Sequence, residues 1–274
     1  MHTFHAIVEG IVQGLTEFLP ISSTAHLRIV PAFAGWEDPG AAFTAVVQLG
    51  TMAAVLLYFR KDLWTIGKAV LAGLRDPAKR TGLEWRLGLY IILGTIPIGI
   101  LGLAFKHKIE HQFRTLELIG AALIVAGLVL AWSERASRRA DQARDIDSLT
   151  PRDATIIGFA QAAALVPGVS RSGATISAGL FLGLDRVAAA RYSFLLSVPA
   201  VVLSGLFELK DVGNGGGYGA GATIIATVLA FVVGYASIAW LLRFITTHTF
   251  DWFVGYRLIL GAVVIALAAA NTIN

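Results

Sequence analysis

The chain has 274 residues, of which 56% are hydrophobic and only 15% are charged. Soluble domains carry about 25% charged residues, so the composition excludes a soluble globular protein and predicts an all-α polytopic membrane protein. The absence of cysteine excludes disulfides and thiolate metal sites. The net charge of +4 comes without the aromatic-interleaved basic patch that nucleic-acid binding would need, so no nucleic acid is expected as a partner.

The first polar stretch within this apolar sequence runs from Glu9 to Val30. Glu9, Gln13 and Glu17 are spaced four residues apart, which places all three on one face of a helix. Pro20 ends that helix. The hydroxyl residues that follow can cap a second short helix: Ser22, Ser23 and Thr24. We expect a re-entrant helical hairpin whose turn offers hydroxyls and free backbone N–H groups to an anion.

A second stretch, from Asp153 to Gly183, has the same design. An apolar helix is predicted to stop at Pro167–Gly168, and Ser170–Gly173 to form the turn. A second helix is then predicted to begin at Ala174. Broken helices of this kind are tolerated at membrane depth where they line a cavity.

Six further segments are long and apolar enough to span a bilayer. They are Ala41–Phe59, Glu84–Phe105, Thr115–Ser133, Val187–Leu209, Gly221–Phe244 and Val254–Asn271. The order is one hairpin and three spans, then the same again. We therefore expect one membrane domain, residues 1–274, with repeats at about 1–134 and 153–274 joined by the charged linker 134–152. Three spans in each half would invert the second repeat relative to the first.

The Lys and Arg residues orient this arrangement. The segment 60–86 has seven of them and the linker has five more. The positive-inside rule places both segments in the cytoplasm. Both termini and the entrance of the first hairpin would then face outward.

Arg171 is a candidate anion ligand, because it lies in an apolar segment with a serine on each side. Its planar guanidinium matches a pair of phosphate or carboxylate oxygens, and Ser170, Ser172 and Gly173 add donors. The alternative is a structural arginine that pairs with Glu17 and ties the two hairpins together. The donor-rich turn favours the anion site.

Three residues of the first hairpin could carry out chemistry. Ser23 and His26 can be neighbours on one helical turn, as a nucleophile and its base or acid; a pair of this kind can equally be structural. Glu17 could bind a hard divalent cation or take a proton from the nucleophile, and Gln13 could coordinate through its carbonyl oxygen. Glu9 is either solvated at the outer entrance or helps to draw a cation inward.

The segments QGLTEFLPISSTAH (Gln13–His26) and PGVSRSGATISAG (Pro167–Gly179), with QLGT at Gln48–Thr51, resemble the bacterial undecaprenyl pyrophosphate phosphatases of the BacA/UppP type. The resemblance extends over the whole chain. It implies hydrolysis of undecaprenyl pyrophosphate to the monophosphate, which recycles the carrier lipid for cell-wall polymers, and an association with bacitracin resistance. It also implies a Mg²⁺ or Ca²⁺ cofactor, a homodimer and a bacterial plasma-membrane location. With the orientation that the loop charges predict, the active site would open to the periplasmic side.

The same resemblance assigns the site residues. Gln13 and Glu17 match the family's (E/Q)xxxE motif. The other active-site positions are matched by Ser23, His26, Ser170, Arg171 and Thr175. Beside them, Ser22, Thr24, Ser172 and Gly173 are expected to help bind the substrate. Two positions depart from the usual pattern, since Ala25 stands where glycine is usual and Gln13 where glutamate is frequent.

We predict a membrane phosphatase in which Arg171 and the serine turns hold the pyrophosphate and a cation near Glu17 offsets its charge. Ser23 attacks the terminal phosphorus, or positions a water for His26; attack by His26 is a third scheme. The alternative function is a transporter or flippase of lipid phosphates, because inverted repeats and broken helices also build secondary transporters. The Ser–His–Glu cluster beside Arg171 distinguishes the two, since transport alone does not require it.

Overall fold

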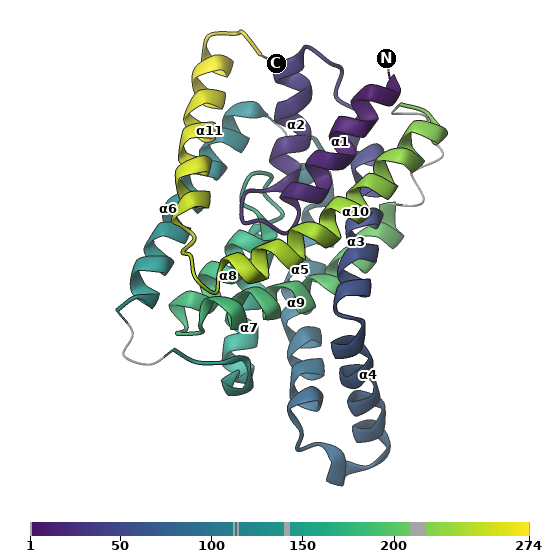
Figure 1. The fold of residues 1–274 in the computed structure, drawn as a ribbon, viewed down its shortest axis with the longest axis vertical. Helices are drawn as coiled ribbons and strands as arrows, with labels where there is room; N and C mark the ends of the chain where they lie inside the picture. Colours follow the sequence, from purple (N-terminus) through teal and green to yellow (C-terminus); the bar gives the residue numbers. More distant parts are fainter. Residues whose placement is uncertain (1, 112, 114, 140–142, 209–217, 274) are drawn as a thin grey trace.

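The computed structural model of the chain describes every residue except 1, 112, 114, 140–142, 209–217 and 274 (Figure 1). The described residues fold into helices, in chain order α1 (His2–Thr16), α2 (Ser23–Ala34), α3 (Gly40–Tyr58), α4 (Arg60–Arg75), α5 (Leu83–His111), α6 (Leu116–Ser137), α7 (Pro151–Ala163), α8 (Arg171–Phe181), α9 (Arg186–Glu208), α10 (Ala220–Phe244) and α11 (Asp251–Ala269). Short 3₁₀ turns occupy Pro77–Lys79 and Ile146–Ser148. Within this part of the chain there is no β-strand, only an isolated bridge between Arg144 and Leu184.

Five of the described helices, α5, α6, α9, α10 and α11, are long and apolar enough to cross a membrane. A sixth span results if α3 and α4, which are bent by 75° relative to each other, are taken together. The prediction of an all-α, multi-pass membrane protein is therefore confirmed. In contrast, α1, α2, α7 and α8 have 15, 12, 13 and 11 residues, fewer than the about 20 residues that a span needs.

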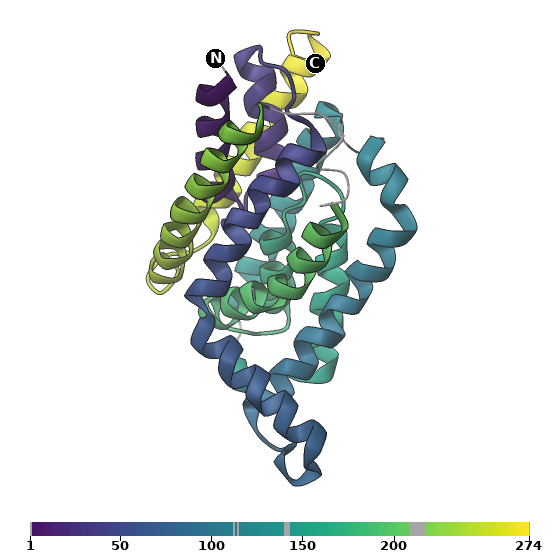
Figure 2. The ribbon, with the colours of Figure 1, turned by 90° about the vertical axis from the view of Figure 1, so that its right-hand side faces the viewer.

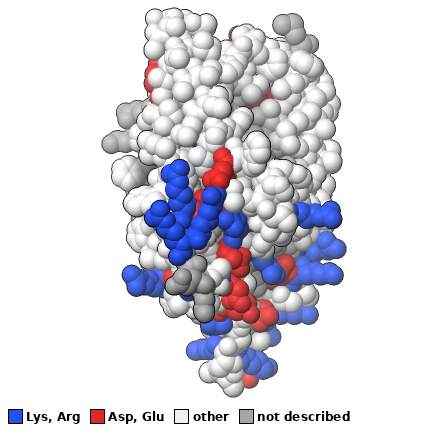
Figure 3. All heavy atoms as spheres, turned by 60° about the vertical axis from the view of Figure 1, so that its left-hand side comes forward, with Lys and Arg blue, Asp and Glu red and all other residues white. Residues whose placement is uncertain are grey.

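The two termini lie at the same end of the molecule, together with α1 and α2 (Figure 1). At the opposite end, α4 and the first turns of α5 project beyond the other helices, as both ribbon views show (Figures 1 and 2). The Lys and Arg side chains gather on the half of the surface that includes this projection, whereas the half near the termini is almost free of charge on the face shown (Figure 3).

The short helices pack on long ones in matching pairs, α1 on α10 and α7 on α5. Each pair meets at a glycine. A Cβ added at Gly10 would lie 2.4 Å from the carbonyl oxygen of Ala226, and one at Gly158 would lie 2.6 Å from that of Gly94. The sequence spacing also matches, with glycine, glutamine and serine at 10, 13 and 22 and again at 158, 161 and 170. The two stretches are therefore held against the bundle in the same way.

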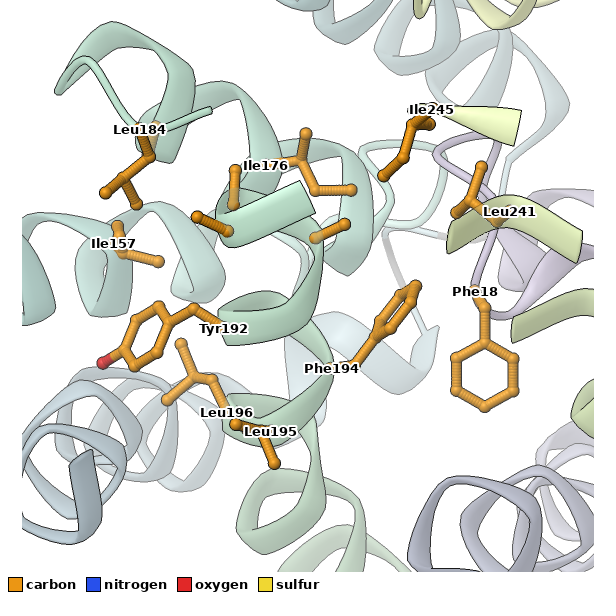
Figure 4. Close-up of a cluster of buried hydrophobic side chains, with 14 of the residues drawn as sticks. Phe18, Ile157, Ile176, Leu184, Tyr192, Phe194, Leu195, Leu196, Leu241 and Ile245 are labelled. Carbon is orange, nitrogen blue, oxygen red and sulfur yellow. The ribbon is translucent and has the colours of Figure 1, made fainter. Parts of the chain in front are cut away.

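A buried apolar cluster centred on α8 and α9 holds the turns in place (Figure 4). Tyr192, Leu195 and Leu196 of α9 are at most 1% exposed. Phe194 of the same helix meets Phe18, in the turn after α1, edge to face at 5.5 Å. Burial of aromatic rings contributes strongly to packing, so this contact fixes the first turn against α9.

Candidate active site

The turns after α1 and α7 end in serine caps of the same unusual geometry. Ser22 has φ of 75° and its hydroxyl accepts a hydrogen bond from the backbone N–H of Ala25. Ser170 has φ of 71° and accepts from Gly173 in the same way. A positive φ is uncommon for a residue with a Cβ and is often found at functional sites. The predicted role of Ser22 as a helix cap is confirmed.

The cap at Ser170 corrects one expectation. The helix after the second turn was predicted to begin at Ala174, but α8 begins at Arg171. The reason is that the Ser170 hydroxyl satisfies the N–H of Gly173, so the residues between them already belong to the first helical turn. Arg171 is thus the first residue of α8, as Ser23 is the first residue of α2.

Glu17 lies at the meeting point of the two turns. Its Oε1 accepts a hydrogen bond from Nη2 of Arg171 at 2.7 Å, across 154 residues of sequence. Its Oε2 accepts from the Ser23 hydroxyl at 2.6 Å and from Nε2 of Gln13 at 3.0 Å. The structure therefore brings three of the predicted site residues around the carboxylate of a fourth, Glu17. It also includes the ion pair on which the structural alternative for Arg171 depends.

The α1 face is continuous up to this carboxylate, although α1 itself ends at Thr16 and not near Pro20 as predicted. The backbone N–H of Glu17 still donates to the carbonyl of Gln13 at 3.0 Å. Gln13 also donates to the Thr51 hydroxyl at 3.3 Å, which connects the QLGT segment of α3 to the site. Gln13 therefore presents its amide nitrogen, and not its oxygen, to Glu17.

His26 is buried and engaged away from Ser23. Its Nδ1 lies 2.7 Å from the carbonyl oxygen of Ser22, and its Nε2 lies 2.6 Å from the Tyr256 hydroxyl. A carbonyl can only accept, so Nδ1 carries the proton and the Nε2 of a neutral ring accepts from Tyr256. Within the described part of the chain, no hydrogen bond joins Ser23 to His26. The geometry gives Ser23 a carboxylate neighbour in place of the expected imidazole.

The other predicted substrate-binding residues hold the turns together. The Ser172 hydroxyl donates to the carbonyl of Leu19 at 3.0 Å and lies 3.1 Å from the Ser170 hydroxyl. The Thr175 hydroxyl is buried 2.6 Å from that of Ser193 in α9. In the first turn, the hydroxyls of Ser22 and Thr24 are 3.1 Å apart, and Thr24 is exposed.

Arg257 is a central residue that our sequence analysis missed. It lies in α11, is fully buried, and donates to the carbonyl oxygens of Pro20 at 2.9 Å and Gly168 at 2.8 Å, one from each turn. Further bonds reach the carbonyls of Val169 and Leu123. Its charge lies inside a segment predicted to span the membrane, which was a usable signal. Tyr256, the partner of His26, gave no such signal.

The oxygen atoms around Glu17 are the hard donors that Mg²⁺ and Ca²⁺ prefer. No group of three or more His, Cys, Asp or Glu side chains that could hold a metal occurs among the described residues. One carboxylate beside a serine hydroxyl is a sparse site, but Mg²⁺ is commonly bound by one or two carboxylates together with substrate phosphates. These residues therefore fit a cation that arrives with a phosphorylated substrate.

Comparison with known proteins identifies the family. The sequence profile of the family described as bacitracin resistance protein BacA matches residues 6–263. The chain belongs to this BacA family. It is 56% identical, over 98% of its length and 97% of the relative's, to an undecaprenyl-diphosphatase of Nocardioides sp.. It is 53% identical to an undecaprenyl-diphosphatase of Mycolicibacterium smegmatis (100% and 99% covered) and 50% identical to undecaprenyl-diphosphatase 2 of Streptomyces coelicolor (100% and 97% covered). The BacA match includes both serine-capped turns.

Proposed function

We propose that the protein is an undecaprenyl pyrophosphate phosphatase, which hydrolyses undecaprenyl pyrophosphate to undecaprenyl phosphate and inorganic phosphate. The observation that carries this function is the contact of Ser23 and Arg171 with the same carboxylate, that of Glu17. A nucleophile, a proton acceptor and a phosphate ligand are the three groups that such a hydrolysis requires. The names of the BacA-family relatives agree with this reaction.

Substrate binding begins with an exchange of partners at Arg171. In the structure the guanidinium is held by Glu17 and by the carbonyl of Ser197 at 3.2 Å. A pyrophosphate carries more charge than one carboxylate and can accept both arms of the guanidinium. Arg171 therefore turns from Glu17 to the terminal phosphate, and the helix N-termini at Ser23 and Arg171 add backbone N–H groups.

The exchange leaves Glu17 able to act as a base. Oε2 of Glu17 takes the proton of the Ser23 hydroxyl, and Ser23 Oγ attacks the terminal phosphorus. The bond from this phosphorus to the bridging oxygen breaks, and undecaprenyl phosphate leaves. The leaving undecaprenyl phosphate takes this proton from Glu17. Glu17 then accepts a proton from a water molecule that attacks the phosphoserine. The bond from phosphorus to Ser23 Oγ breaks, Ser23 Oγ takes the proton back from Glu17, and inorganic phosphate leaves. The role of His26 is to hold the α2 turn through Ser22, with Tyr256 as its second partner.

Glu17 is the protein ligand that we assign to a Mg²⁺ or Ca²⁺ ion, with the substrate phosphates and water as the other ligands. Such an ion, when bound, neutralises charge on the pyrophosphate. Gln13 supports Glu17 by donating a hydrogen bond to it. The remaining hydroxyls, those of Ser22, Thr24, Ser170, Ser172 and Thr175, shape the two turns.

We further propose that the membrane architecture is an inverted repeat of six spans and two re-entrant hairpins, α1–α2 and α7–α8, in one domain. The matched caps, the matched glycine contacts and the location of the two hairpins toward opposite ends of the bundle support it. Since the basic end is placed in the cytoplasm, the first hairpin enters from the periplasmic face of the plasma membrane, to which the active site opens. A homodimer remains a prediction from the family resemblance.

Phosphate release tests this function directly. Protein purified in detergent is mixed with undecaprenyl pyrophosphate and a divalent cation, and inorganic phosphate and lipid products are measured. We expect stoichiometric phosphate and undecaprenyl phosphate, and none with the Ser23→Ala variant. Binding of the lipid without phosphate release would overturn the proposal and favour the transporter.

A further inference from the structure

Glu9 is fully buried, and neither of its carboxylate oxygens has a hydrogen-bond partner. One turn further along the same face of α1, Oε1 of Gln13 is also buried and unpartnered, as is the hydroxyl of Tyr218. Buried polar atoms are nearly always satisfied, and a buried carboxylate without a donor or a cation is costly. Gln161, the equivalent of Gln13 in the second stretch, has the same unpartnered Oε1, so the two carboxylate oxygens of Glu9 are the observation that points to a ligand supplying positive charge.

The fold itself does not require a carboxylate at this position. The repeated spacing makes Glu9 equivalent to Ile157, because each residue directly precedes the glycine at which its helix meets the bundle, Gly10 and Gly158. Ile157 is 1% exposed and belongs to the apolar core. In the second repeat an isoleucine fills the equivalent buried position. Packing therefore does not explain why the first repeat has a glutamate there.

The region around Glu9 is acidic toward the molecular surface. Burial raises the pKa of the Tyr218 hydroxyl to about 12, and the nearby Glu9 carboxylate is the next cause. Glu37 and Asp38 act on Tyr218 in the same direction and are both exposed. Asp38 is paired with Arg28 at 3.6 Å, so the surface near this region is acidic mainly through Glu37.

The side-chain amide of Gln13 lies between Glu9 and Glu17 along the helix face and turns its nitrogen, not its oxygen, toward Glu17. Its Nε2 donates to Glu17 and to Thr51, so the oxygen of the same planar amide is directed away from them. Glu9 lies four residues earlier and is its neighbour on the helix face. An amide oxygen and a carboxylate are both ligands of calcium.

We propose that Glu9 and Oε1 of Gln13 are the protein ligands of a calcium site, separate from the cation bound with substrate at Glu17. Water molecules complete the coordination, and the Tyr218 hydroxyl hydrogen-bonds to one of them. Calcium accepts six to eight oxygen ligands in flexible geometry, which suits a site with few protein ligands. A single carboxylate predicts a dissociation constant of about 10⁻⁴–10⁻³ M, as in extracellular calcium modules.

Calcium binding to the purified protein tests this site without any need for catalysis. The background is the Glu17→Gln variant, which removes the carboxylate assigned to the substrate-linked cation. In this background we compare Glu9→Gln, which keeps the shape, Glu9→Ile, which copies the second repeat, and Glu117→Gln, a matched control at an exposed carboxylate of α6. Equilibrium dialysis with radioactive calcium gives the affinity, and thermal unfolding in detergent reports whether each variant is folded.

We expect Glu17→Gln and its Glu117→Gln derivative to bind one calcium ion with equal affinity, and calcium to raise their unfolding temperatures. Both Glu9 variants should fold, bind at least about tenfold more weakly and lose the thermal shift. Unchanged binding in Glu9→Gln, or no binding in the Glu17→Gln background, would overturn the site. Neither result bears on phosphate release by the wild-type protein, so failure of this proposal and failure of the proposed function can be told apart.

Discussion

The Ser23 hydroxyl donates a hydrogen bond to Oε2 of Glu17 at 2.6 Å, which joins the first residue of α2 to the residue that follows α1. The distance is short for an O–H···O bond and typical of a hydroxyl bound to a carboxylate. This contact makes Glu17 the nearest proton acceptor for Ser23, whereas His26 is occupied by Ser22 and Tyr256.

The first prediction concerns this pair. Glu17→Gln should lower turnover by about 10²–10⁴-fold, because the amide cannot take the proton. Ser23→Ala should abolish turnover while lipid binding persists. Rapid acid quench of the wild type should trap an acid-stable phosphoserine at Ser23. A matched control is Ser237→Ala, whose hydroxyl bonds within α10; its turnover should be normal. An acid-labile phosphoenzyme would instead identify His26 as the nucleophile.

Tyr256 is expected to position His26 and not to react. Tyr256→Phe removes the donor to Nε2 and keeps the ring that stacks on the imidazole, with the planes 7° apart. We expect a loss of turnover of up to about tenfold, the worth of one hydrogen bond. In a double-mutant cycle with His26→Gln, the two losses should not add. Additive losses would show that Tyr256 acts independently of His26.

Arg171 should tolerate no other cation. Arg171→Lys keeps the charge but loses the two-armed contact, so the variant should fold and lose most of its activity. A phosphate ligand predicts a rise in KM together with a fall in kcat, and weaker binding of inorganic pyrophosphate as an inhibitor. If Arg171 only ties the turns together, Arg171→Lys would lower the unfolding temperature and leave the kinetics of the folded fraction unchanged.

The local features of the site could be predicted from the sequence, since they follow from neighbouring residues. The cap at Ser22 and the presence of a break in each stretch are of this kind, as is the shared face of Glu9, Gln13 and Glu17. The helices before the two breaks end at Thr16 and Ala163, ahead of the prolines at which they were predicted to stop. The start of α8 was predicted three residues too late because the sequence does not show that Ser170 has a positive φ. Only a glycine at that position would have indicated such a backbone.

Contacts between distant segments could not be predicted in the same way. Arg257 binds carbonyl oxygens of Pro20 and Gly168, which no side-chain pattern records. Its charge in an apolar segment signalled a function but not a partner. The pairing of His26 with Tyr256, separated by 230 residues, has no sequence signal. Spacing therefore paired Ser23 with His26, whereas the hydrogen bond of the Ser23 hydroxyl in the structure goes to Glu17.

Single cysteines test the proposed orientation, and the absence of native cysteine makes the labelling clean. We expect cysteines at Lys79 and Arg139, both exposed at the basic end, to be protected from an impermeant thiol reagent in intact cells. Cysteines at Glu37 and Thr272, exposed near the termini, should be labelled. Permeabilised cells, in which all four should react, serve as the control. The reverse pattern would place the first hairpin's entrance in the cytoplasm.

The glycine contacts provide the last prediction. Gly10→Ala and Gly158→Ala would each place a methyl group against a backbone carbonyl oxygen, at 2.4 Å from that of Ala226 and 2.6 Å from that of Gly94. Backbone atoms cannot rotate away, so each variant should lose about 1–3 kcal/mol of stability through overpacking. That loss exceeds the gain of about 0.5–1 kcal/mol from replacing a helical glycine. Gly99→Ala in α5, where no atom lies within 4 Å of the added Cβ, is the matched control and should be neutral or slightly stabilising.

Thermal unfolding in detergent measures the stability of all three variants. Because the two contacts are on different helix pairs, the double variant Gly10→Ala/Gly158→Ala should show additive losses. Normal stability of Gly10→Ala together with a loss in Gly158→Ala would show that the two hairpins are not held in the same way.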